Sequence, residues 1–556
     1  MLNSMAVKSI FSFFGGTGHD GNLSIFLEGK IHTVEFERIF GNRFFCRQHN
    51  PFSFYSLDIE QTFFPGKEED TINLLNYIKE ILVSRGVFSD HYEVGLFDWD
   101  TPEKIVEIVS RFFSIQEVCY KDDVTSHHKA HAASAFYSSG FDKAMVFSYD
   151  GGGNDGNFCV YDIEKSNPSF KQINKRDEVP YSTKYARLAN FTKEIKKPTP
   201  RDYLDSQRHE HNGVSYPGKL MGLAAYGSFN QNFYNKISAY LKDEETQNFS
   251  PSFLDNFENY QYDQFEGPLS YDFAFNSQLV FEETFLERFH QFFDKNKHKN
   301  VCLTGGGALN VVLNERLSKT YPETNFFIPS SPGDSGISYG MITHYMNGPV
   351  VPEVMYSGCG ILDKGSLPYI LDHRAWKKAT PELIATELEK GKIIGICRGD
   401  SETGPRALGN RSILADPRSH KSKDAINSKV KFREWFRPFA PICKEDKAST
   451  FFETSDNACY KYMSFSPPVR EKYKKVLPAV THVDGSARLQ TISKKDNEFI
   501  YNTLDEFEKI TNIPILVNTS FNSRGKAILT RYLTAIQILD STELDAVVLE
   551  DYYIYK

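Results

Sequence analysis

The 556-residue sequence predicts an α/β protein with more than one folded unit. Three observations support this prediction. Short apolar strands alternate with amphipathic helices, several strands end in glycine-rich turns, and the chain is longer than one hydrophobic core usually supports. Free backbone N–H groups and a helix N-terminus both attract anions, so the repeated succession of strand, glycine turn and helix favours a nucleotide-binding fold.

The first unit is expected to begin with strands. Residues 8–39 carry apolar side chains at strand period, and Glu28-Gly29-Lys30 suits a hairpin turn. A helix over about 70–85, a strand over 93–98, a histidine-bearing helix from 127 and a strand over 143–150 follow. Further strands and helices are expected within 157–163, 216–227, 273–295, 301–307, 308–319 and 324–345.

A second α/β unit is expected after a linker. Glycine and proline recur between about residues 347 and 380, which is typical of a linker. The remaining residues have strands of their own at 392–399, 513–520 and 544–550. We therefore predict a domain over residues 1–350 and another over 351–556.

Composition narrows the class of protein. No stretch reaches the roughly 18–20 uninterrupted apolar residues of a membrane span, and the N-terminus lacks the apolar core and cleavage site of a signal peptide. The eight cysteines form no CxxC pair, so neither a disulfide framework nor a zinc ribbon is indicated. The net charge of −8 gives no global reason for tight nucleic-acid binding. We expect a cytoplasmic protein with no membrane partner.

Two histidines and two aspartates form the candidate metal site. His127 and His131 stand at i and i+4 of the expected helix, so their rings share a face and can meet one cation. Asp150 and Asp334 follow strand ends beside glycines, where a carboxylate can face a cleft and complete the coordination. Alternatively, the histidines could simply pack against neighbouring helices and the aspartates could cap turns. The occurrence of all four residues together favours a metal-binding site.

Glycine-rich turns mark where a ligand can approach the backbone. At the triple glycine of residues 305–307, followed by Asn310, a nucleotide could come close, although a plain turn is equally consistent with the pattern. In the first turn, His19 and Asp20 could polarise or deprotonate a hydroxyl acceptor, because a histidine with a near-neutral pKa suits general-base work. Solvated turn residues are the alternative for this pair.

The second unit is rich in cations and hydrogen-bond donors that suit an anionic, phosphate-bearing ligand. Guanidinium groups bind phosphates bidentately, and hydroxyls add short hydrogen bonds. These groups are tens of residues apart, so only folding can bring them together, and a solvated basic surface is the alternative. They are Arg406, Arg411, Arg418, Lys429, Lys431, Arg433, Arg437, Arg488, Asn518, Ser520 and Asn522.

Nine motifs occur in one order along nearly the whole chain. They are HHKAHAASAF, YDGGGNDGN, PGKLMGLAAYG, GGGALN, PGDSG, GPRALGNRSILADPR, NSKVKFREWFRPFAPI, HVDGSARLQT and NTSFN. With these motifs in this order, the sequence resembles the carbamoyltransferase family that includes the nodulation-factor and antibiotic O-carbamoyltransferases. Hydrogenase-maturation relatives also carry an acylphosphatase domain and paired-cysteine zinc fingers, and their absence from this sequence argues against that role.

The resemblance implies a fold for each domain and a two-step reaction. The first domain would be actin/Hsp70-like (Kae1-like) and the second a YrdC-like α/β domain. In the second domain, carbamoyl phosphate and ATP, with Mg²⁺, would give carbamoyl adenylate, pyrophosphate and phosphate. In the first, an acceptor hydroxyl would attack the carbonyl of this intermediate, and AMP would leave. Activation as an adenylate provides a better leaving group and a handle for binding and orientation.

The resemblance also implies roles for single residues. An iron-like divalent metal, Fe²⁺, would be held by His127, His131, Asp150 and Asp334 and would orient the nucleotide phosphate and act as a Lewis acid. Carbamoyl phosphate and the adenylate would be held by Arg406, Lys431, Arg488, Ser520 and Asn518, of which Arg406 and Lys431 would also be catalytic. Acceptor activation would fall to His19 and Asp20. The nucleotide-cleft motifs contribute Lys219, Gly222, Gly306 and Asn310, and His128 is expected to be structural.

The sequence is therefore expected to encode an ATP-dependent O-carbamoyltransferase that acts on a hydroxyl of a small molecule or sugar. One alternative places the hydroxyl on a nucleotide or nucleic-acid base, such as a hydroxymethyl pyrimidine, and the negative net charge weakens it. Another is a non-catalytic actin-like nucleotide-binding regulator. The presence of both residue sets argues against the regulator, because a binding module needs no second active site.

Overall fold

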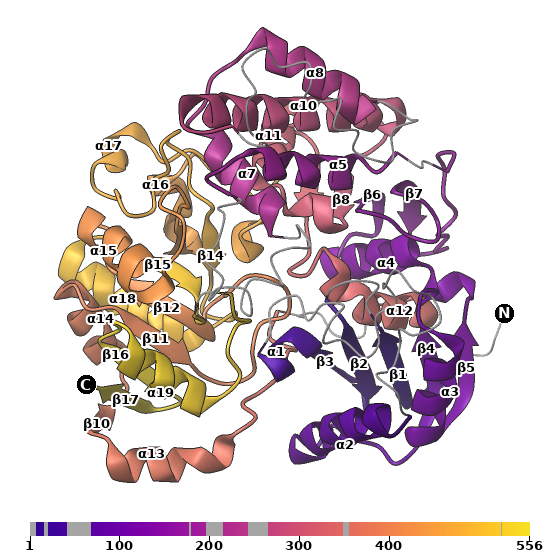
Figure 1. The fold of residues 1–556 in the computed structure, drawn as a ribbon, viewed down its shortest axis with the longest axis horizontal. Helices are drawn as coiled ribbons and strands as arrows, with labels where there is room; N and C mark the ends of the chain where they lie inside the picture. Colours follow the sequence, from indigo (N-terminus) through magenta and orange to yellow (C-terminus); the bar gives the residue numbers. More distant parts are fainter. Residues whose placement is uncertain are drawn as a thin grey trace.

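The computed structural model of the protein has two α/β halves with a cavity between them (Figure 1). It describes residues 7–15, 20–41, 68–176, 179–195, 215–242, 265–348, 355–523 and 525–556. The described strands form three sheets, two from the first part of the chain and one from the second. The α/β fold class predicted from the sequence is confirmed.

The first sheet joins an antiparallel hairpin to a parallel pair. Its order is β3-β2-β1-β4-β5, antiparallel among the first three strands and parallel from β1 through β4 to β5. The strands are β1 Ser9–Phe14, β2 Asn22–Leu27, β3 Lys30–Glu35, β4 Tyr92–Phe97 and β5 Ile115–Tyr120. The predicted hairpin turn is confirmed, because Glu28 and Gly29 join β2 to β3 with φ values of 50° and 80°.

Two helices cover one face of this sheet. They are α2 Glu68–Ser84 and α3 Glu103–Phe112, and the short helix α1 Phe36–Phe40 continues from β3. Leu75 of α2 and Ile105 of α3 share a buried core with Phe11 and Phe13 of β1. The apolar residues of α2 and α3 therefore recur at helical spacing because one face of each helix is buried against the sheet.

The second sheet resembles the first in joining an antiparallel hairpin to parallel strands. Its order is β7-β6-β8-β9, with an antiparallel β6/β7 hairpin followed by parallel β8 and β9. The strands are β6 Lys143–Tyr149, β7 Phe158–Glu164, β8 Asn300–Thr304 and β9 Asn325–Phe327. The helices beside it are α5 Tyr181–Leu188, α7 Tyr216–Ala224, α8 Gln231–Lys242, α10 Pro268–Phe292 and α11 Val311–Thr320.

Helices α4 His127–Ser139 and α12 Ile337–Met346 lie between the two sheets (Figure 1). The α4 residue Phe136 packs in one core with Val146 of β6, and the α12 residue Ile342 packs in another with Ile10 of β1. The two helices approach closely at Gly340, where a Cβ atom would lie 2.0 Å from the carbonyl oxygen of Ala130. This packing brings the N-terminal ends of both helices, with the histidines and Asp334, together.

The third sheet forms the core of the C-terminal half. Its order is β10-β17-β16-β11-β12-β15-β13-β14. The strands are β10 Trp376–Lys378, β11 Ile394–Cys397, β12 Arg411–Ala415, β13 Ala440–Lys444, β14 Gln490–Ile492, β15 Ile515–Ser520, β16 Ala546–Leu549 and β17 Tyr552–Tyr555. The helices are α13 Leu367–His373, α14 Pro381–Glu389, α15 His420–Ala425, α16 Ala448–Phe451, α17 Glu471–Lys474, α18 Glu498–Thr511 and α19 Tyr532–Ser541.

The three strands predicted for the second unit are confirmed as β11, β15 and β16. The predicted domain boundary between residues 350 and 351 lies outside the described residues. Within the described part of the chain, no helix is both long and apolar enough to span a membrane. All the described cysteines are free thiols.

Candidate functional site

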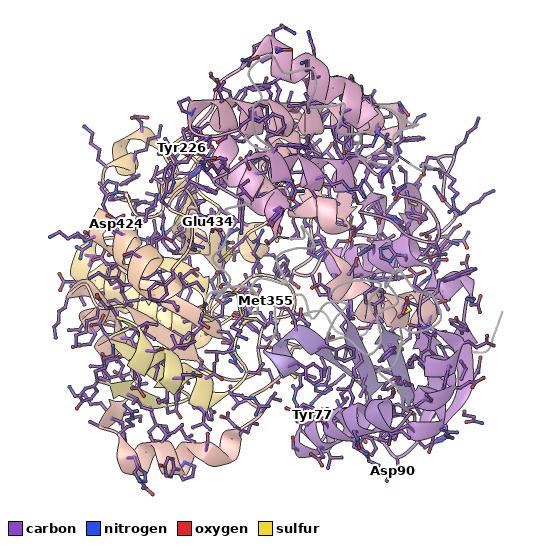
Figure 2. All side chains as sticks on the ribbon, in the orientation of Figure 1. Tyr77, Asp90, Tyr226, Met355, Asp424 and Glu434 are labelled. Atoms are coloured by element: carbon purple, nitrogen blue, oxygen red, sulfur yellow. The ribbon has the colours of Figure 1, made fainter. Side chains whose placement is uncertain are left out.

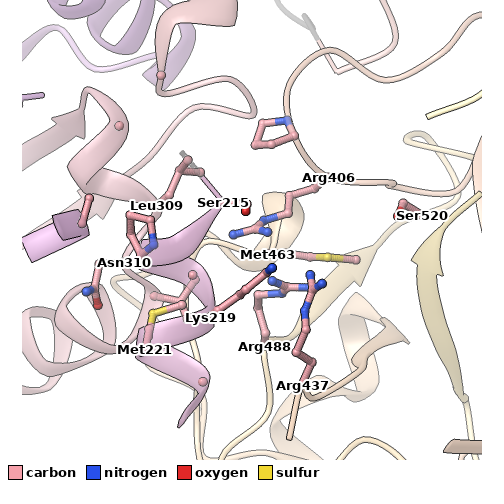
Figure 3. A pocket seen from close by; sticks show the side chains of 18 of the residues that line it. Ser215, Lys219, Met221, Leu309, Asn310, Arg406, Arg437, Met463, Arg488 and Ser520 are labelled. Carbon is pink, nitrogen blue, oxygen red and sulfur yellow. The ribbon is translucent and has the colours of Figure 1, made fainter. Parts of the chain in front are cut away.

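A cavity of about 670 Å³ lies where the two halves meet. The first half contributes Asp150 and Asp334 to its wall, and the second half contributes Arg406, Lys431 and Arg488. Figure 3 shows several of the lining side chains, with the arginines directed into the same space as Lys219 from α7. The two predicted sites, for a metal and for an anion, therefore face one cavity.

The four predicted metal ligands converge at the edge of this cavity. The Nε2 atoms of His127 and His131 are 3.2 Å apart, and Asp150 Oδ2 lies 3.2 Å from His131 Nε2. Asp334 Oδ1 lies 3.6 Å from His127 Nε2 and 3.5 Å from His131 Nε2. One ligand atom from each residue falls within 4.8 Å of the other three. Two imidazole nitrogens and two carboxylate oxygens at these separations fit a divalent transition metal.

The loop after β6 fixes the orientation of the histidine helix. Asn154 Oδ1 accepts a hydrogen bond from the backbone N–H of His127 at 2.9 Å, and Asp155 Oδ1 accepts one from the N–H of His128 at 3.1 Å. These are two of the N–H groups that the first turn of a helix leaves without internal partners. The GGGND segment thus caps α4, a role that its glycines did not indicate.

Electrostatics separates the two kinds of histidine in this helix. Burial opposes protonation of His131, but hydrogen bonds with Asp150 and Asp334 raise its pKa to about 9. Burial lowers the pKa of His128 to about 4, and its ring nitrogens contact Ser148 Oγ at 2.7 Å and the carbonyl of Gly156 at 2.9 Å. His128 therefore has a structural environment, whereas His131 faces the carboxylates.

Backbone donors from a glycine turn hold Asp150 in place. Its Oδ2 accepts a hydrogen bond from the N–H of Gly306 at 2.6 Å, and its Oδ1 accepts one from Gly151 at 2.5 Å. Gly305 has a φ of +85°, and a Cβ atom there would lie 2.3 Å from the carbonyl oxygen of Tyr149. Glycine is required at that position because the backbone conformation and the close approach both exclude a side chain.

The predicted acceptor-activating pair is only partly described. His19 lies outside the described residues, and Asp20 lines the cavity with a φ of 58°. The neighbouring Asn22 was not predicted from the sequence. Its side chain donates to the carbonyls of Asp20 at 2.6 Å and Asp334 at 2.9 Å and accepts from Ser338 N–H at 3.2 Å. Asn22 thus ties the first turn to the loop that carries a predicted metal ligand.

Cationic groups gather in the part of the cavity formed by the C-terminal half. The guanidinium groups of Arg437 and Arg488 lie beside each other, with Arg406 and Lys219 near them (Figure 3). Burial, followed by the nearby Arg437 charge, lowers the pKa of Arg488 to about 10. Among the described residues, no carboxylate forms an ion pair with Arg488. A partly buried guanidinium at a cavity wall, with no carboxylate partner, suits a site that takes an anion.

Lys431 contacts oxygens of the strand end that carries Ser520. Its Nζ donates to the carbonyl of Ser520 at 2.7 Å, to Ser520 Oγ at 3.2 Å and to the carbonyl of Asn522 at 3.0 Å, and it also contacts Asn522 Oδ1. Both Lys431 and Ser520 line the cavity. The structure thus brings together two of the residues predicted to bind the anion, although 89 positions separate them.

The predicted nucleotide-cleft residues also line the cavity, and several have structural partners. Lys219 Nζ lies 2.9 Å from Glu434 Oε1, an ion pair between α7 and the C-terminal half. Figure 2 shows Glu434 at this junction, with Tyr226 nearby. Asn310 Oδ1 accepts from the N–H of Leu313 at 3.1 Å and so caps α11, and a Cβ atom on Gly222 would be in ordinary contact with Pro438.

Not all the cations of the second unit reach the cavity wall. Arg411 is fully buried and donates to the carbonyls of Arg398 and Gly399, each at 2.7 Å. Arg418 pairs with Asp416 at 2.6 Å, and Lys429 pairs with Glu543 at 2.7 Å. The cavity wall instead takes Arg406, Lys431, Arg433, Arg437 and Arg488. Asn518 also lines it, but its amide nitrogen donates to the carbonyl of Ala407 at 3.0 Å.

Comparisons with known proteins match both parts of the chain to carbamoyltransferases. The family described as Carbamoyltransferase N-terminus matches residues 42–342, and the one described as Carbamoyltransferase C-terminus matches residues 385–556. Nodulation protein NolO of Bradyrhizobium diazoefficiens is 32% identical over 453 residues, covering 78% of this chain and 79% of the relative. Nodulation protein U of Sinorhizobium fredii is 30% identical over 500 residues, covering 83% and 82%.

A solved structure with a distant likeness is that of full-length HypF in the phosphate- and nucleotide-bound form. It covers 61% of this chain and 55% of its own, at 15% sequence identity and a TM-score of 0.32. A likeness at this level supports no conclusion about the site.

Proposed function

Because the chain belongs to the carbamoyltransferase family, we propose that it transfers carbamoyl groups as an ATP-dependent O-carbamoyltransferase with two successive steps. That it is an enzyme of carbamoyl transfer follows from the family itself. The proposal adds that carbamoyl phosphate and ATP form carbamoyl adenylate, and that a hydroxyl of a small molecule or sugar then takes the carbamoyl group.

The first step belongs to the cationic part of the cavity. Water cleaves carbamoyl phosphate to carbamate and phosphate, and a carbamate oxygen attacks the α-phosphorus of ATP, so that pyrophosphate leaves. Arg406, Arg488 and Lys431 bind the phosphate groups, with Ser520 as a further hydrogen-bond donor. The partly buried environment of Arg488, with the Arg437 guanidinium beside it, supports this assignment, because an anionic ligand would supply a negative charge next to Arg488.

The second step belongs to the part lined by Asp20, Asp150 and Asp334. The acceptor hydroxyl attacks the carbamoyl carbon, AMP leaves, and the hydroxyl proton passes to a base near the first turn, for which Asp20 is the described candidate. His127, His131, Asp150 and Asp334 would hold a divalent metal such as Fe²⁺. When bound, such a metal supplies Lewis acidity toward phosphate or carbonyl oxygens.

The single observation that carries the proposal is that residues of both sets line one cavity between the halves: Asp150 and Asp334 of the metal set, and Arg406, Lys431, Arg488, Asn518 and Ser520 of the anion set. A carbamoyl adenylate formed beside Arg406 then has a path to Asp150 and Asp334 within the protein. This arrangement suits a reactive intermediate, because it limits hydrolysis in bulk water.

Product analysis with candidate acceptors tests the proposal. The full-length protein would be incubated with ATP, Mg²⁺, Fe²⁺, isotope-labelled carbamoyl phosphate and a panel of amino sugars, oligosaccharides and nucleosides. We expect AMP, pyrophosphate and one labelled carbamate ester in wild type, and about 100-fold less of each in Arg406→Ala. If label enters a nucleoside rather than a sugar, the acceptor class is corrected. If no pyrophosphate forms, the adenylate route is wrong.

A further inference from the structure

A buried ion pair in the first half forms hydrogen bonds with the loop that carries Arg406. Glu35, at the end of β3, and Arg38, in α1, are 4% and 1% exposed, and Arg38 Nε lies 2.5 Å from Glu35 Oε2. Glu35 Oε1 accepts a hydrogen bond from the N–H of Gly404 at 3.0 Å. Arg38 donates to the carbonyl oxygen of the same glycine at 2.6 Å. Both backbone polar groups of Gly404 are thus bound by one pair of side chains.

Gly404 also packs against the loop that leads to the predicted metal ligand Asp334. Gly404 has a φ of +95°, and a Cβ atom there would lie 2.3 Å from the carbonyl oxygen of Ser330. The next residue, Ser331, forms a hydrogen bond through its Oγ with the Oγ of Ser335 at 2.5 Å. Ser335 directly follows the predicted metal ligand Asp334. Gly404 is therefore a point where the loops of both half-sites meet, two residues before Arg406.

Stability alone is a weak reason for such a pair. Removing a carboxylate and a guanidinium from water is costly, and replacing a buried ion pair with well-packed neutral side chains of similar volume is often neutral or stabilising. Burial raises the pKa of Glu35 and the Arg38 charge opposes this rise, so desolvation of the carboxyl group offsets part of what the pair contributes to stability. The pair instead fixes the orientation of the loop, because its two side chains bind the two peptide groups on either side of the Gly404 Cα atom.

We propose that Glu35 and Arg38 are positioning residues for the carbamoyl transfer reaction, which hold Gly404 so that Arg406 faces the cavity in register with the metal-side loop. This inference rests on the proposed function of Arg406 in binding carbamoyl phosphate. The pair also anchors α1 to the C-terminal half from its other side, because Thr530 Oγ1 donates to the carbonyl of Arg38 at 2.9 Å. Glu35 lines the cavity, but its Oε1 binds the N–H of Gly404 and its Oε2 pairs with Arg38, so this assignment gives neither residue a contact with the reacting groups.

The test compares a neutral replacement of the pair with a matched control. The double variant Glu35→Gln/Arg38→Met removes both charges at similar volume, and Glu35→Gln alone keeps an oxygen for the N–H of Gly404. The control Lys444→Met removes a different buried cation from its ion pairs with Asp505 and Glu508, each at 2.9 Å, away from the cavity lining. Pyrophosphate release from ATP and carbamoyl phosphate is measured for each full-length protein, together with hydrogen–deuterium exchange of residues 403–408.

We expect the double variant to lose about tenfold or more in kcat/KM for carbamoyl phosphate, with faster exchange at residues 403–408, because a loosened loop misplaces a binding group. Glu35→Gln should recover part of that loss, and Lys444→Met should keep wild-type kinetics and exchange in this loop.

The role of the pair is overturned if the wild type releases pyrophosphate and the double variant behaves like the control. Lost activity without faster exchange there also overturns it. A wild type that releases no pyrophosphate overturns the proposed function itself.

Discussion

At the scale of one residue, the positive charge of Arg488 favours anion binding in the cavity but disfavours the folded state. Its guanidinium is partly buried beside Arg437, and burial followed by the Arg437 charge lowers its pKa to about 10, so the folded protein bears part of the cost of desolvating a cation. We predict that Arg488→Met lowers the rate of pyrophosphate formation by about 100-fold, because a charge-assisted contact to the anion is lost. The same change should leave the melting temperature unchanged or raise it, because it removes a partly buried cation that no carboxylate of the described residues pairs with.

Steady-state kinetics and thermal unfolding of Arg488→Met check this prediction, with Arg374→Ala as the control. Arg374 forms a partly exposed ion pair with Asp540 at 2.6 Å and lies outside the cavity lining. A variant that is destabilised yet fully active would show that Arg488 is structural.

The metal cluster gives a second residue-scale prediction. Two imidazoles and two carboxylates within 4.8 Å of one another should bind one divalent transition metal per chain. We predict that His131→Ala weakens Fe²⁺ or Mn²⁺ binding by about 100-fold or more, because it removes the ligand atom nearest to Asp150. Calorimetric titration of the metal-free protein measures this, with the exposed His373→Ala as control. Unchanged affinity would rule out the site.

Sequence spacing predicted the local part of the site but not its long-range partners. His127 and His131 share a helix face by their four-residue spacing, and glycines at strand ends indicated Asp150 and Asp334. Glu35 and Arg38 were missed, although two opposite charges in the apolar run VEFERIF were a possible signal. Their partner, Gly404, lies 369 residues from Glu35, and no local pattern encodes such a contact. The same holds for Lys219, whose pairing with Glu434 depends on how the halves meet.

At the scale of elements, the close contact between α4 and α12 sets the distance between metal ligands. A Cβ atom at Gly340 would lie 2.0 Å from the carbonyl oxygen of Ala130, so the helices must separate to accept one. We predict that Gly340→Ala lowers the free energy of unfolding by about 1–3 kcal/mol. It should also weaken metal binding, because α4 carries His131 and α12 follows Asp334 directly.

Denaturant unfolding and metal titration of Gly340→Ala test this, with Gly365→Ala as the control because no atom would lie within 4 Å of its added Cβ. Equal stability of the two variants would contradict the role of the contact.

Long periodic elements were predictable, whereas short ones were not. The strands over Lys143–Tyr149 and Ile515–Ser520 are apolar along their length, as buried strands are, and their positions were predicted. The strands Trp376–Lys378 and Gln490–Ile492 have three residues each, too few to show a period. They exist because neighbouring strands pair with them.

At the scale of the whole molecule, one buried ion pair joins α7 to the C-terminal half. Burial opposes ionisation of Glu434, but Lys219 and Arg437 lower its pKa to about 2 from an ordinary value of 4.5. Its contribution to stability is therefore fully present above about pH 4.5 and is lost as the pH falls through about 2. It amounts to an upper limit on the order of 3 kcal/mol.

We predict that Glu434→Gln is less stable than wild type near neutral pH and that the difference shrinks as the pH is lowered from about 5 to about 3. Denaturant unfolding across this range measures the difference. A constant difference would show that the charge of Glu434 does not join the halves.

The two half-sites of the cavity are proposed to act in succession, and pyrophosphate formation separates the first step from the second. Wild type, Arg406→Ala and His127→Ala would be assayed with ATP, Mg²⁺ and carbamoyl phosphate. We predict pyrophosphate from wild type, a loss of about 100-fold in Arg406→Ala, and near wild-type release in His127→Ala, because the metal side acts only after the adenylate has formed. No pyrophosphate from wild type, or equal loss in both variants, would contradict the claim.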